Sequence, residues 1–364
     1  MTENAAVPIP VAAPVIDQET LDLLPIKKLN ADIRAAAATL GVKEARWLVQ
    51  NYYRRQEARI KSDNQESALT KLGEPHAVIA WLAGHETRLE TQIAIMLRCY
   101  AEGQPLGRWA MSQIGIAGTL AAGLLAHVRF EKRSDGTCFP PTVGHVWSYA
   151  GLDPRVKWLG KTGAADLVES VMGKDKAVTS DHLVAISERC RRRVENIIRG
   201  TCKGTDGNHD ETRMTRANLV KFMSKPPWNQ DFKLLCFKIG QSFMKVSGNP
   251  NSKYGLMYAQ RRVIEDRKND AGEFREQAEE SLRSKKYDKS TPTYASYASG
   301  KLPPGRIQRR ACRYATKIFL SNYWEFGYKL HFKADPPKPF AIAMLGHAHH
   351  IPPTWGPKRE EDKT

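Results

Sequence analysis

The sequence has few cysteines and no paired cysteine motif. Its six cysteines are scattered over 364 residues, and this spacing predicts neither a zinc ribbon nor a disulfide framework. Long apolar runs are also missing, because no uncharged stretch reaches the roughly 20 residues needed to cross a bilayer. Residues 1–16 are rich in Ala, Pro and Val but lack the basic start of a signal peptide. We therefore expect a cytoplasmic protein with free thiols and no membrane span.

Negative charge is the other scarcity. The chain has 56 Lys and Arg against 39 Asp and Glu, a net charge of +17. Such an excess favours polyanionic partners, among which nucleic acid is the commonest, although a ribosome-associated protein or one bound to an anionic membrane would share it. The length and a hydrophobic content of 41% suffice for a sizeable core in two or three domains.

Strand-like alternation is absent, so the sequence predicts an all-α fold. Apolar spacing predicts helices over residues 26–40, 43–62 and 75–101. The second has one apolar and one basic face, which fits either a solvated face of a three-helix bundle or a helix facing nucleic acid. The third has nearly heptad spacing and predicts half of an antiparallel coiled coil or the seam of a homo-oligomer.

Residues 114–128, IGIAGTLAAGLLAHV, predict a tight turn running straight into a helix. Gly115 and Gly118 permit unusual backbone angles and close approach. In such a hairpin the backbone N–H groups at the turn and at the helix start, around Thr119, point outward and hold a DNA phosphate. The alternative is a buried small-residue helix packed against another, and these fifteen residues alone leave both open.

A second segment, SYAGLDP at residues 148–154, follows closely. The hairpin and this segment together resemble the C-terminal domain of the bridge-RNA-guided insertion-sequence transposases, a bacterial family with an acidic nuclease-like domain and a C-terminal serine. The whole chain looks more closely like phage and mobile-element proteins that carry this domain behind a helical N-terminus. That closer resemblance also rests on Tyr52, Tyr53, Gln56, Arg59, Ile60, Pro227-Trp228-Asn229 and Lys238-Ile239-Gly240-Gln241-Ser242-Phe243.

The resemblance implies DNA recombination by a magnesium-binding acidic α/β domain and by a serine in a Ser-Gly pair after the GLxP segment. Here the residues before the hairpin are helical and basic, so we expect the acidic domain to be absent. The Ser-Gly position falls on Leu159-Gly160 or Thr162-Gly163. Leucine cannot attack a phosphodiester, and Thr162 is a weak candidate without a recognisable base. We therefore expect no cofactor, with Mg²⁺ required only if the protein is a recombinase.

Further basic segments complete the predicted nucleic-acid contacts. Residues 157–163 predict an exposed loop, and residues 164–224 depart from the family pattern and predict an inserted subdomain with an arginine-rich helix after Ser180. A third cluster opens a long helix near residue 306, where the helix dipole disfavours cations without an anionic neighbour. The candidates are Lys157, Lys161, Arg189, Arg191, Arg192, Arg193, Arg199, Arg306, Arg309, Arg310 and Arg313.

The C-terminal residues His347, His349 and His350 lack carboxylate partners in sequence, so we interpret them as part of a packed loop and predict no metal site. The predicted divisions are a disordered tail (1–21), a helical arm (22–103), the hairpin domain (104–246, with the insertion at 164–224), C-terminal helices (247–335) and an irregular tail (336–364).

The leading hypothesis is a nucleic-acid-binding protein of a phage or mobile element, located in the cytoplasm of a bacterial host, with DNA preferred over RNA. The alternatives are a partner-dependent recombinase using Thr162, Ser148 or Ser242 as nucleophile, and an assembly protein whose basic faces meet acidic proteins.

Overall fold

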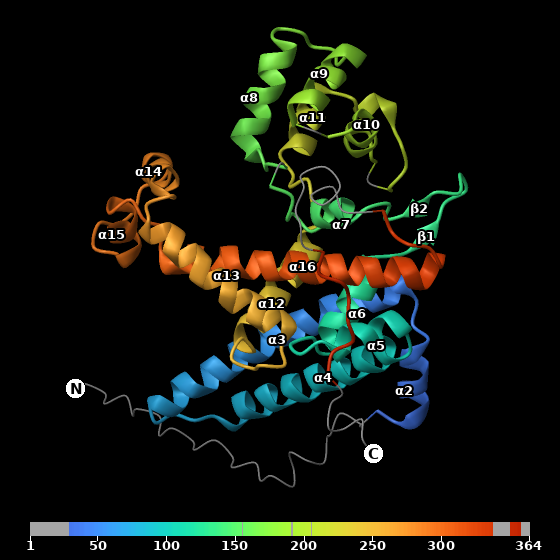
Figure 1. The fold of residues 1–364 in the computed structure, drawn as a ribbon, viewed down its shortest axis with the longest axis vertical. Helices are drawn as coiled ribbons and strands as arrows, with labels where there is room; N and C mark the ends of the chain where they lie inside the picture. Colours follow the sequence, from blue (N-terminus) through green and yellow to red (C-terminus); the bar gives the residue numbers. More distant parts are fainter. Residues whose placement is uncertain (1–28, 155, 191, 205, 338–349, 358–364) are drawn as a thin grey trace, which may run out of the picture. The chain divides into compact units, whose positions relative to one another are not determined.

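The chain forms an almost entirely helical structure, which confirms the predicted all-α class (Figure 1). This computed structural model describes residues 29–337 and 350–357, except 155, 191 and 205. Within these ranges there are fifteen α-helices, a short 3-10 helix and a sheet of two strands. None of the helices in the described ranges is both long and apolar enough to cross a bilayer. The predicted tail at residues 1–21 lies outside the described residues.

The contacts divide the chain into two compact units. Unit 1 comprises residues up to Arg108 together with Ala117–Ala126, and unit 2 comprises Trp109–Ile116 and the chain from His127 onward. The chain therefore passes between the units within α5 (Pro105–Ser112), again in the turn after it, and again at the end of α6 (Gly118–His127). The units group helices by packing, and the domain boundaries at residues 104 and 247 stay a prediction.

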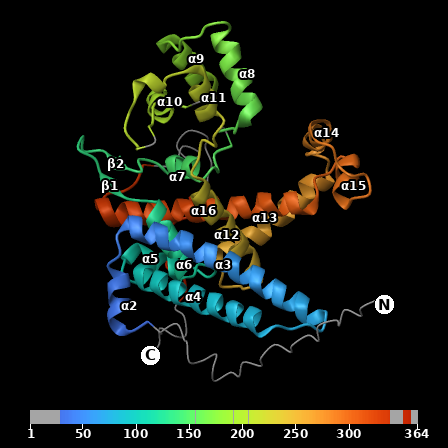
Figure 2. The ribbon, with the colours of Figure 1, turned by 180° about the vertical axis from the view of Figure 1, so that it is seen from behind.

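Unit 1 is built on two long helices joined by a short turn, α3 (Val42–Lys71) and α4 (Ala77–Glu102), which lie side by side in both ribbon views (Figures 1 and 2). The short helix α2 (Ala31–Ala38) packs on α4. Ala45, Leu97 and Leu124, which come from α3, α4 and α6, are fully buried. The antiparallel arm predicted for residues 75–101 is therefore a contact of α4 with α3 of the same chain.

The basic face of α3 turns mainly toward its own unit. The Arg59 Nε atom lies 2.6 Å from Glu90 Oε2, and Arg55 Nη1 lies 3.3 Å from Glu86 Oε1, both on α4. Arg46 Nη2 donates to the carbonyl oxygen of Ala126 at 2.6 Å. Such partly exposed ion pairs contribute about 0–1 kcal/mol each, so they join the two helices only weakly. The basic face predicted for this helix is thus largely occupied by intramolecular partners.

Unit 2 is organised around the long helix α16 (Pro304–Phe332). Helices α13 (Lys253–Asp270), α12 (Gln230–Lys245) and α7 (Val143–Tyr149) pack on it. Large side chains fill the core, among them Trp109, Phe243, Phe319 and Tyr323, each under 1% exposed. The strands β1 (Glu131–Lys132) and β2 (Cys138–Phe139) pair antiparallel with Glu131 opposite Phe139. Two short helices, α14 (Arg275–Ser284) and α15 (Pro292–Ala298), share a small core around Tyr297.

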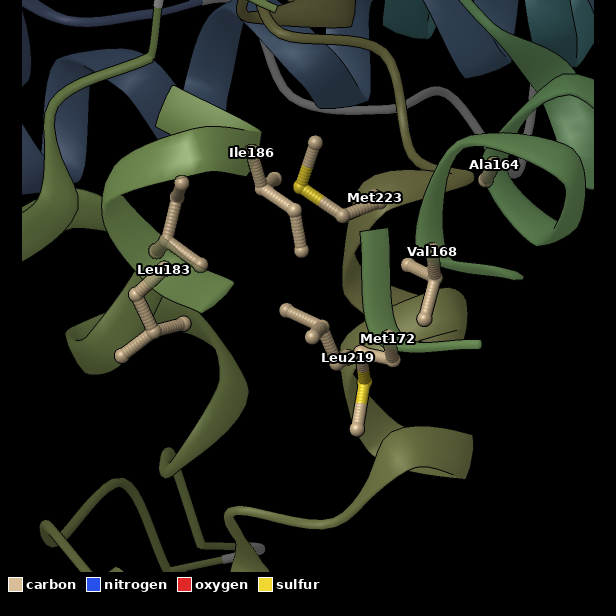
Figure 3. Packing of buried hydrophobic residues seen from close by; sticks show 8 residues of the cluster. Ala164, Val168, Met172, Leu183, Ile186, Leu219 and Met223 are labelled. Carbon is tan, nitrogen blue, oxygen red and sulfur yellow. The ribbon is translucent and has the colours of Figure 1, made fainter. Parts of the chain in front are cut away.

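Residues 160–224, here called the 160–224 lobe, form a helical group with its own core. Its helices are α8 (Gly160–Met172), α9 (Ser180–Cys190), α10 (Val194–Thr201) and α11 (Arg216–Met223), with a 3-10 turn at Glu211–Arg213. Val168, Ile186, Ile197 and Leu219 are fully buried, and the side chains of three of these helices meet in Figure 3. The Trp158 Nε1 atom donates to the Ser224 carbonyl oxygen at 2.7 Å, so the two ends of the lobe meet.

Two predictions about this region are wrong. The predicted exposed loop at residues 157–163 ends early, because α8 begins at Gly160. The single arginine-rich helix is two helices: α9 stops at Cys190, and α10 starts at Val194. Both α9 and α10 bury an apolar stripe in the lobe core, with Leu183 and Ile186 on one and Ile197 on the other. A break between them lets both stripes face the same core.

A C-terminal strap, residues 350–357, lies across unit 2. The Thr354 carbonyl oxygen accepts hydrogen bonds from Trp109 Nε1 at 3.1 Å and from Gln113 Nε2 at 3.0 Å. The His350 Nε2 atom lies 2.7 Å from Glu325 Oε2 on α16. His350 thus belongs to a packed segment, as predicted, whereas His347 and His349 lie outside the described residues.

Candidate nucleic-acid interface

Four cations lie along one face of α16. Arg306, Arg309, Arg313 and Lys317 follow each other at spacings of three or four residues, which places them on the same side of a helix. We call these four residues the α16 basic face. Ile307, Ala311, Ala315 and Phe319 lie on the opposite side and are fully buried. The burial of this apolar stripe fixes the rotation of α16 and so keeps the basic residues directed outward.

The three arginines of this face have no acidic partner within the described ranges. Arg306, Arg309 and Arg313 are all exposed, and no described carboxylate lies within 4.0 Å of any of them. Most of the ordered arginines on α3 and α13, in contrast, pair with a carboxylate. The α16 basic face is therefore a local excess of positive charge.

Burial and neighbouring cations lower the pKa of Arg313 on this face and of Lys233 on α12. Desolvation lowers the pKa of Arg313, and the nearby cations Arg310 and Arg306 lower it further. Lys233 on α12 shows the same pattern, because desolvation lowers its pKa first and Arg313 lowers it again. A depressed pKa in a cation means that the charged form is disfavoured at that place. An anion bound near Arg313 and Lys233 would relieve this repulsion.

Arg310 belongs to the structure of unit 2. Its side chain ion-pairs with Glu265 on α13, which is 1% exposed and also pairs with Arg261. The Arg310 guanidinium also lies 4.3 Å from the centre of the Phe274 ring. The sequence predicted an anionic neighbour for the 306–313 cluster, and for Arg310 that neighbour is Glu265.

Trp147 contacts the α16 basic face and Trp228 contacts α12, and each has a lysine against its ring. The Lys317 Nζ atom lies 4.2 Å from the centre of the Trp147 ring, and Lys233 Nζ lies 3.6 Å from the centre of the Trp228 ring. We call them the two Trp–Lys pairs. Such a cation–π contact is worth about 0.5–1 kcal/mol at an exposed site. A nucleobase stacked on an aromatic side chain is worth about 1–3 kcal/mol, which is more than such a contact contributes at an exposed site.

The structure brings together two segments on which the family resemblance rests. The Asn229 N–H donates to the Tyr149 carbonyl oxygen at 3.0 Å, and the same asparagine caps α12 by accepting from the Phe232 N–H. Gly151 has a φ of +64°, and a Cβ there would lie 2.8 Å from the Trp228 ring. The glycine of the SYAGLDP segment therefore makes room for the tryptophan of Pro227-Trp228-Asn229. Trp228 belongs to the segments that carry the resemblance, whereas no sequence pattern marks Trp147, Lys233 or Lys317 as a candidate contact, because only the fold brings them together near α16.

The predicted hairpin is present as a helix, a short turn and a helix. Gly115 has a φ of +102°, and its carbonyl oxygen accepts a hydrogen bond from the Ser242 hydroxyl. Gly118 is the first residue of α6, where a Cβ would lie 2.7 Å from the Arg98 Cα atom. Thr119 is half-buried beside Tyr52. Close packing thus accounts for Gly118, and phosphate binding by the turn stays a prediction.

The predicted basic residues around the lobe divide into two kinds. Arg192 is a structural residue, because its guanidinium donates to the Lys225 carbonyl oxygen at 2.8 Å and lies 5.4 Å from the centre of the Phe222 ring. Arg189 donates to Ser170, and Arg199 donates to Asn196. The exposed members of the set are Lys157, Lys161, Arg189, Arg193 and Arg199. Arg191 lies outside the described residues.

The three candidate nucleophiles lie in different surroundings. Thr162 is exposed on α8, whereas the Ser242 hydroxyl is engaged by the Gly115 carbonyl oxygen. The Ser148 hydroxyl donates to Asp153 Oδ2 at 3.1 Å, which links the end of α7 to the loop that follows. Among the residues that the structure describes, no three His, Cys, Asp or Glu side chains gather as a metal site.

Comparison of the chain with protein-family models, with curated proteins and with solved structures finds no match.

Proposed function

We propose that this protein binds nucleic acid through the α16 basic face, with DNA as the first candidate and RNA as the second. The observation that carries the proposal is the row of Arg306, Arg309 and Arg313, which are exposed on one helix face with no described carboxylate in ion-pair range. Arginine suits this role because its planar fork grips phosphate oxygens with two hydrogen bonds. The net charge of +17 adds long-range attraction toward a polyanion.

The length of the row of cations on α16 fits the spacing of phosphates along a nucleic-acid strand. Arg306, Arg309, Arg313 and Lys317 extend over three turns of helix, and an α-helix rises about 1.5 Å per residue, so the row extends over roughly 16 Å. Phosphates along one strand of nucleic acid recur every few ångströms. The row is therefore long enough to contact several successive phosphates rather than a single anion.

The proposal also covers the evolutionary origin of the protein. The α5–α6 hairpin and the junction of SYAGLDP with Pro227-Trp228-Asn229 support descent from the C-terminal domain of the insertion-sequence transposases, in a phage or mobile element. In this proposal the 160–224 lobe and the helical arm of unit 1 are additions to that domain. No observation on the described residues favours the recombinase or the assembly protein over nucleic-acid binding.

The test replaces Arg306, Arg309 and Arg313 together with glutamine. Each phosphate contact on duplex DNA contributes about 0.9 to the slope of log K against log salt concentration, so we expect a slope shallower by about 2 to 3 and an affinity lower by roughly 10- to 100-fold at moderate salt. Electrophoretic shift or fluorescence anisotropy over a salt series measures both.

The matched control changes the same amount of charge elsewhere. Arg34, Arg54 and Lys71 are exposed residues of unit 1, and their triple glutamine variant should bind almost as the wild type does. Equal losses in the two variants would show that binding follows net charge alone and would overturn the assignment to α16. Binding of acidic proteins with no binding of DNA or RNA would favour the assembly protein.

A further inference from the structure

The two Trp–Lys pairs point to the kind of nucleic acid that this face takes, and the inference rests on the function proposed above. Trp147 and Trp228 are half-buried, so each indole keeps part of its surface open to solvent. The group against each ring is the end of a flexible lysine, 4.2 Å away at Lys317 and 3.6 Å away at Lys233. An ammonium ion is a compact, strongly hydrated charge on a mobile stem. It leaves a ring face more readily than a packed side chain does.

Fixed neighbours hold the two indoles in place. The Trp147 Nε1 atom donates to the Lys317 carbonyl oxygen at 3.3 Å, which ties this ring to the backbone of α16. Trp228 packs against Gly151, where a Cβ would be 2.8 Å from its ring, and Asn229 next to it is bonded to Tyr149. The rings are therefore held by a backbone hydrogen bond and by close packing, whereas each lysine meets its ring only through the end of its side chain.

Basic side chains connect the two pairs. Lys317 belongs to the α16 basic face, one turn beyond Arg313. Lys233 lies one turn before Cys236 on α12, and the carbonyl oxygen of Cys236 accepts a hydrogen bond from the Thr316 hydroxyl of α16 at 3.5 Å. Burial lowers the pKa of Lys233, and the charge of Arg313 lowers it further. A strand whose phosphates follow Arg306, Arg309 and Arg313 thus reaches both pairs. Aromatic rings beside a basic track are the arrangement by which proteins bind single strands, since every base has a face that can stack.

A double helix cannot use these rings in the same way. Its bases are already stacked on each other, and their faces are closed to a side chain unless the duplex is opened at an energetic cost. Only unpaired nucleotides can place a base on Trp147 or Trp228 without that cost. The Trp–Lys pairs therefore discriminate between single strands and duplexes, whereas the arginines alone do not.

We propose that Trp147 and Trp228 are stacking sites for unpaired bases of a single-stranded nucleic acid whose phosphates lie on the α16 basic face. On binding, a base replaces the ammonium of Lys317 or Lys233 on the indole, and the displaced ammonium moves to a neighbouring phosphate.

The experiment compares four probes of equal length: oligo(dT), oligo(U), a duplex of mixed sequence, and an abasic strand that keeps the phosphates and sugars of oligo(dT) without its bases. Wild-type protein should bind oligo(dT) about 10- to 100-fold more tightly than the abasic strand, with quenching of tryptophan fluorescence by the former only. Oligo(U) tests whether the 2′-hydroxyl matters, since stacking alone treats the two sugars alike. Removal of bases from the probe leaves the protein unchanged, so this comparison does not depend on the folding of any variant.

The protein side of the experiment uses Trp147→Leu and Trp228→Leu, with Trp147→Phe and Trp228→Phe as conservative variants. Each leucine variant should lose about 5- to 50-fold in affinity for oligo(dT) and almost nothing for the abasic strand or the duplex, and each phenylalanine variant should recover most of the loss. Trp47→Leu is the control, because Trp47 is the most exposed tryptophan of unit 1, at 61%. Helical circular dichroism confirms that each variant is folded.

The outcomes test the stacking sites separately from nucleic-acid binding by the α16 basic face. Equal affinity of the wild type for oligo(dT) and the abasic strand, or leucine variants that weaken every probe alike, would overturn the stacking sites and leave nucleic-acid binding by α16 intact. An absence of binding to all four probes would overturn both.

Discussion

At the scale of single residues, Glu265 shows that some arginines of unit 2 form ion pairs inside the protein. This carboxylate is 1% exposed and lies between the guanidinium groups of Arg261 and Arg310. Breaking a buried ion pair by removing one partner leaves the other charge without compensation. The two arginine side chains here are 31% and 28% exposed. Water that reaches them reduces the energetic cost of losing the carboxylate.

We expect Glu265→Gln to lower the free energy of unfolding by roughly 2–3 kcal/mol, below the 3–5 kcal/mol typical of fully buried pairs. Asp270→Asn is the control, because Asp270 pairs with Lys301 at the surface and is 71% exposed, so its loss should cost under about 1 kcal/mol. Urea unfolding followed by circular dichroism measures both. A cost for Glu265→Gln no larger than that of the control would contradict this role.

The same residue makes part of the stability depend on pH. Desolvation raises the pKa of Glu265, but hydrogen bonds from Arg310 and Arg261 outweigh it and hold the pKa below its ordinary value of 4.5. A carboxyl whose pKa is lower in the folded than in the unfolded state stabilises the fold above the unfolded pKa, and this contribution is lost as the pH falls through the folded pKa. Between pH 6 and pH 3 the wild type should therefore lose more stability than Glu265→Gln does.

At the scale of elements, the α5–turn–α6 hairpin has two interpretations, a closely packed helix or a phosphate-binding turn. They predict different results for the same variant. A Cβ at Gly118 would lie 2.7 Å from both Cα and Cβ of Arg98, and overpacking of this kind costs about 1–3 kcal/mol. Gly118→Ala should therefore lower the melting temperature. Thr119→Ser keeps the hydroxyl and removes one methyl group, and it should change the melting temperature less.

Affinity for duplex DNA, expressed per folded molecule, completes this measurement. If the turn holds a phosphate through its backbone N–H groups, Gly118→Ala weakens the binding of the folded fraction as well. Unchanged affinity alongside a lower melting temperature assigns Gly118 to packing alone. The buried surroundings of α6, with Ala121, Ala122 and Leu124 fully enclosed, favour the second result.

Much of the helical pattern was predictable from local sequence, because apolar spacing reports which face is buried. The helix predicted for residues 75–101 is α4 at Ala77–Glu102, and the long helix predicted near residue 306 is α16 at Pro304–Phe332. The break between α9 and α10 was not predictable, since Leu183, Ile186, Cys190, Val194 and Ile197 fit one continuous helix. The break becomes evident only in the fold, because the apolar stripes of both helices pack into the same small core.

The candidate interface was predictable only in part. The cluster of arginines at residues 306–313 is visible in the sequence, but the separation of Arg310 from its neighbours depends on Glu265, which lies 45 residues away. Likewise, Trp147 and Lys317 are 170 residues apart, so no local pattern pairs them. Long-range contacts decide which cations are used inside the protein and which remain available for a ligand.

At the scale of the whole molecule, the excess of positive charge makes binding depend strongly on salt. With four cations on the α16 basic face and Lys233 beside it, about five phosphate contacts give a slope near −4.5 for duplex DNA and near −3.5 for a single strand. Raising the salt from 50 to 200 mM should then weaken binding by roughly 10²- to 10³-fold. Titrations at four salt concentrations measure the slope, and an affinity that hardly changes over this range would speak against a phosphate-dominated interface.

The three passages of the chain between units have a consequence for synthesis on the ribosome. Unit 1 lacks α6 until residue 126 has been made, because this helix follows a segment, Trp109–Ile116, that belongs to unit 2. An N-terminal product ending at Arg108 would lack α6, whose Gly118 packs against Arg98 of α4 and whose Ala126 carbonyl oxygen accepts a hydrogen bond from Arg46 of α3. Folding of the nascent chain therefore cannot complete one unit before the next begins, and a gene fragment meant to yield unit 1 must extend at least through Ala126.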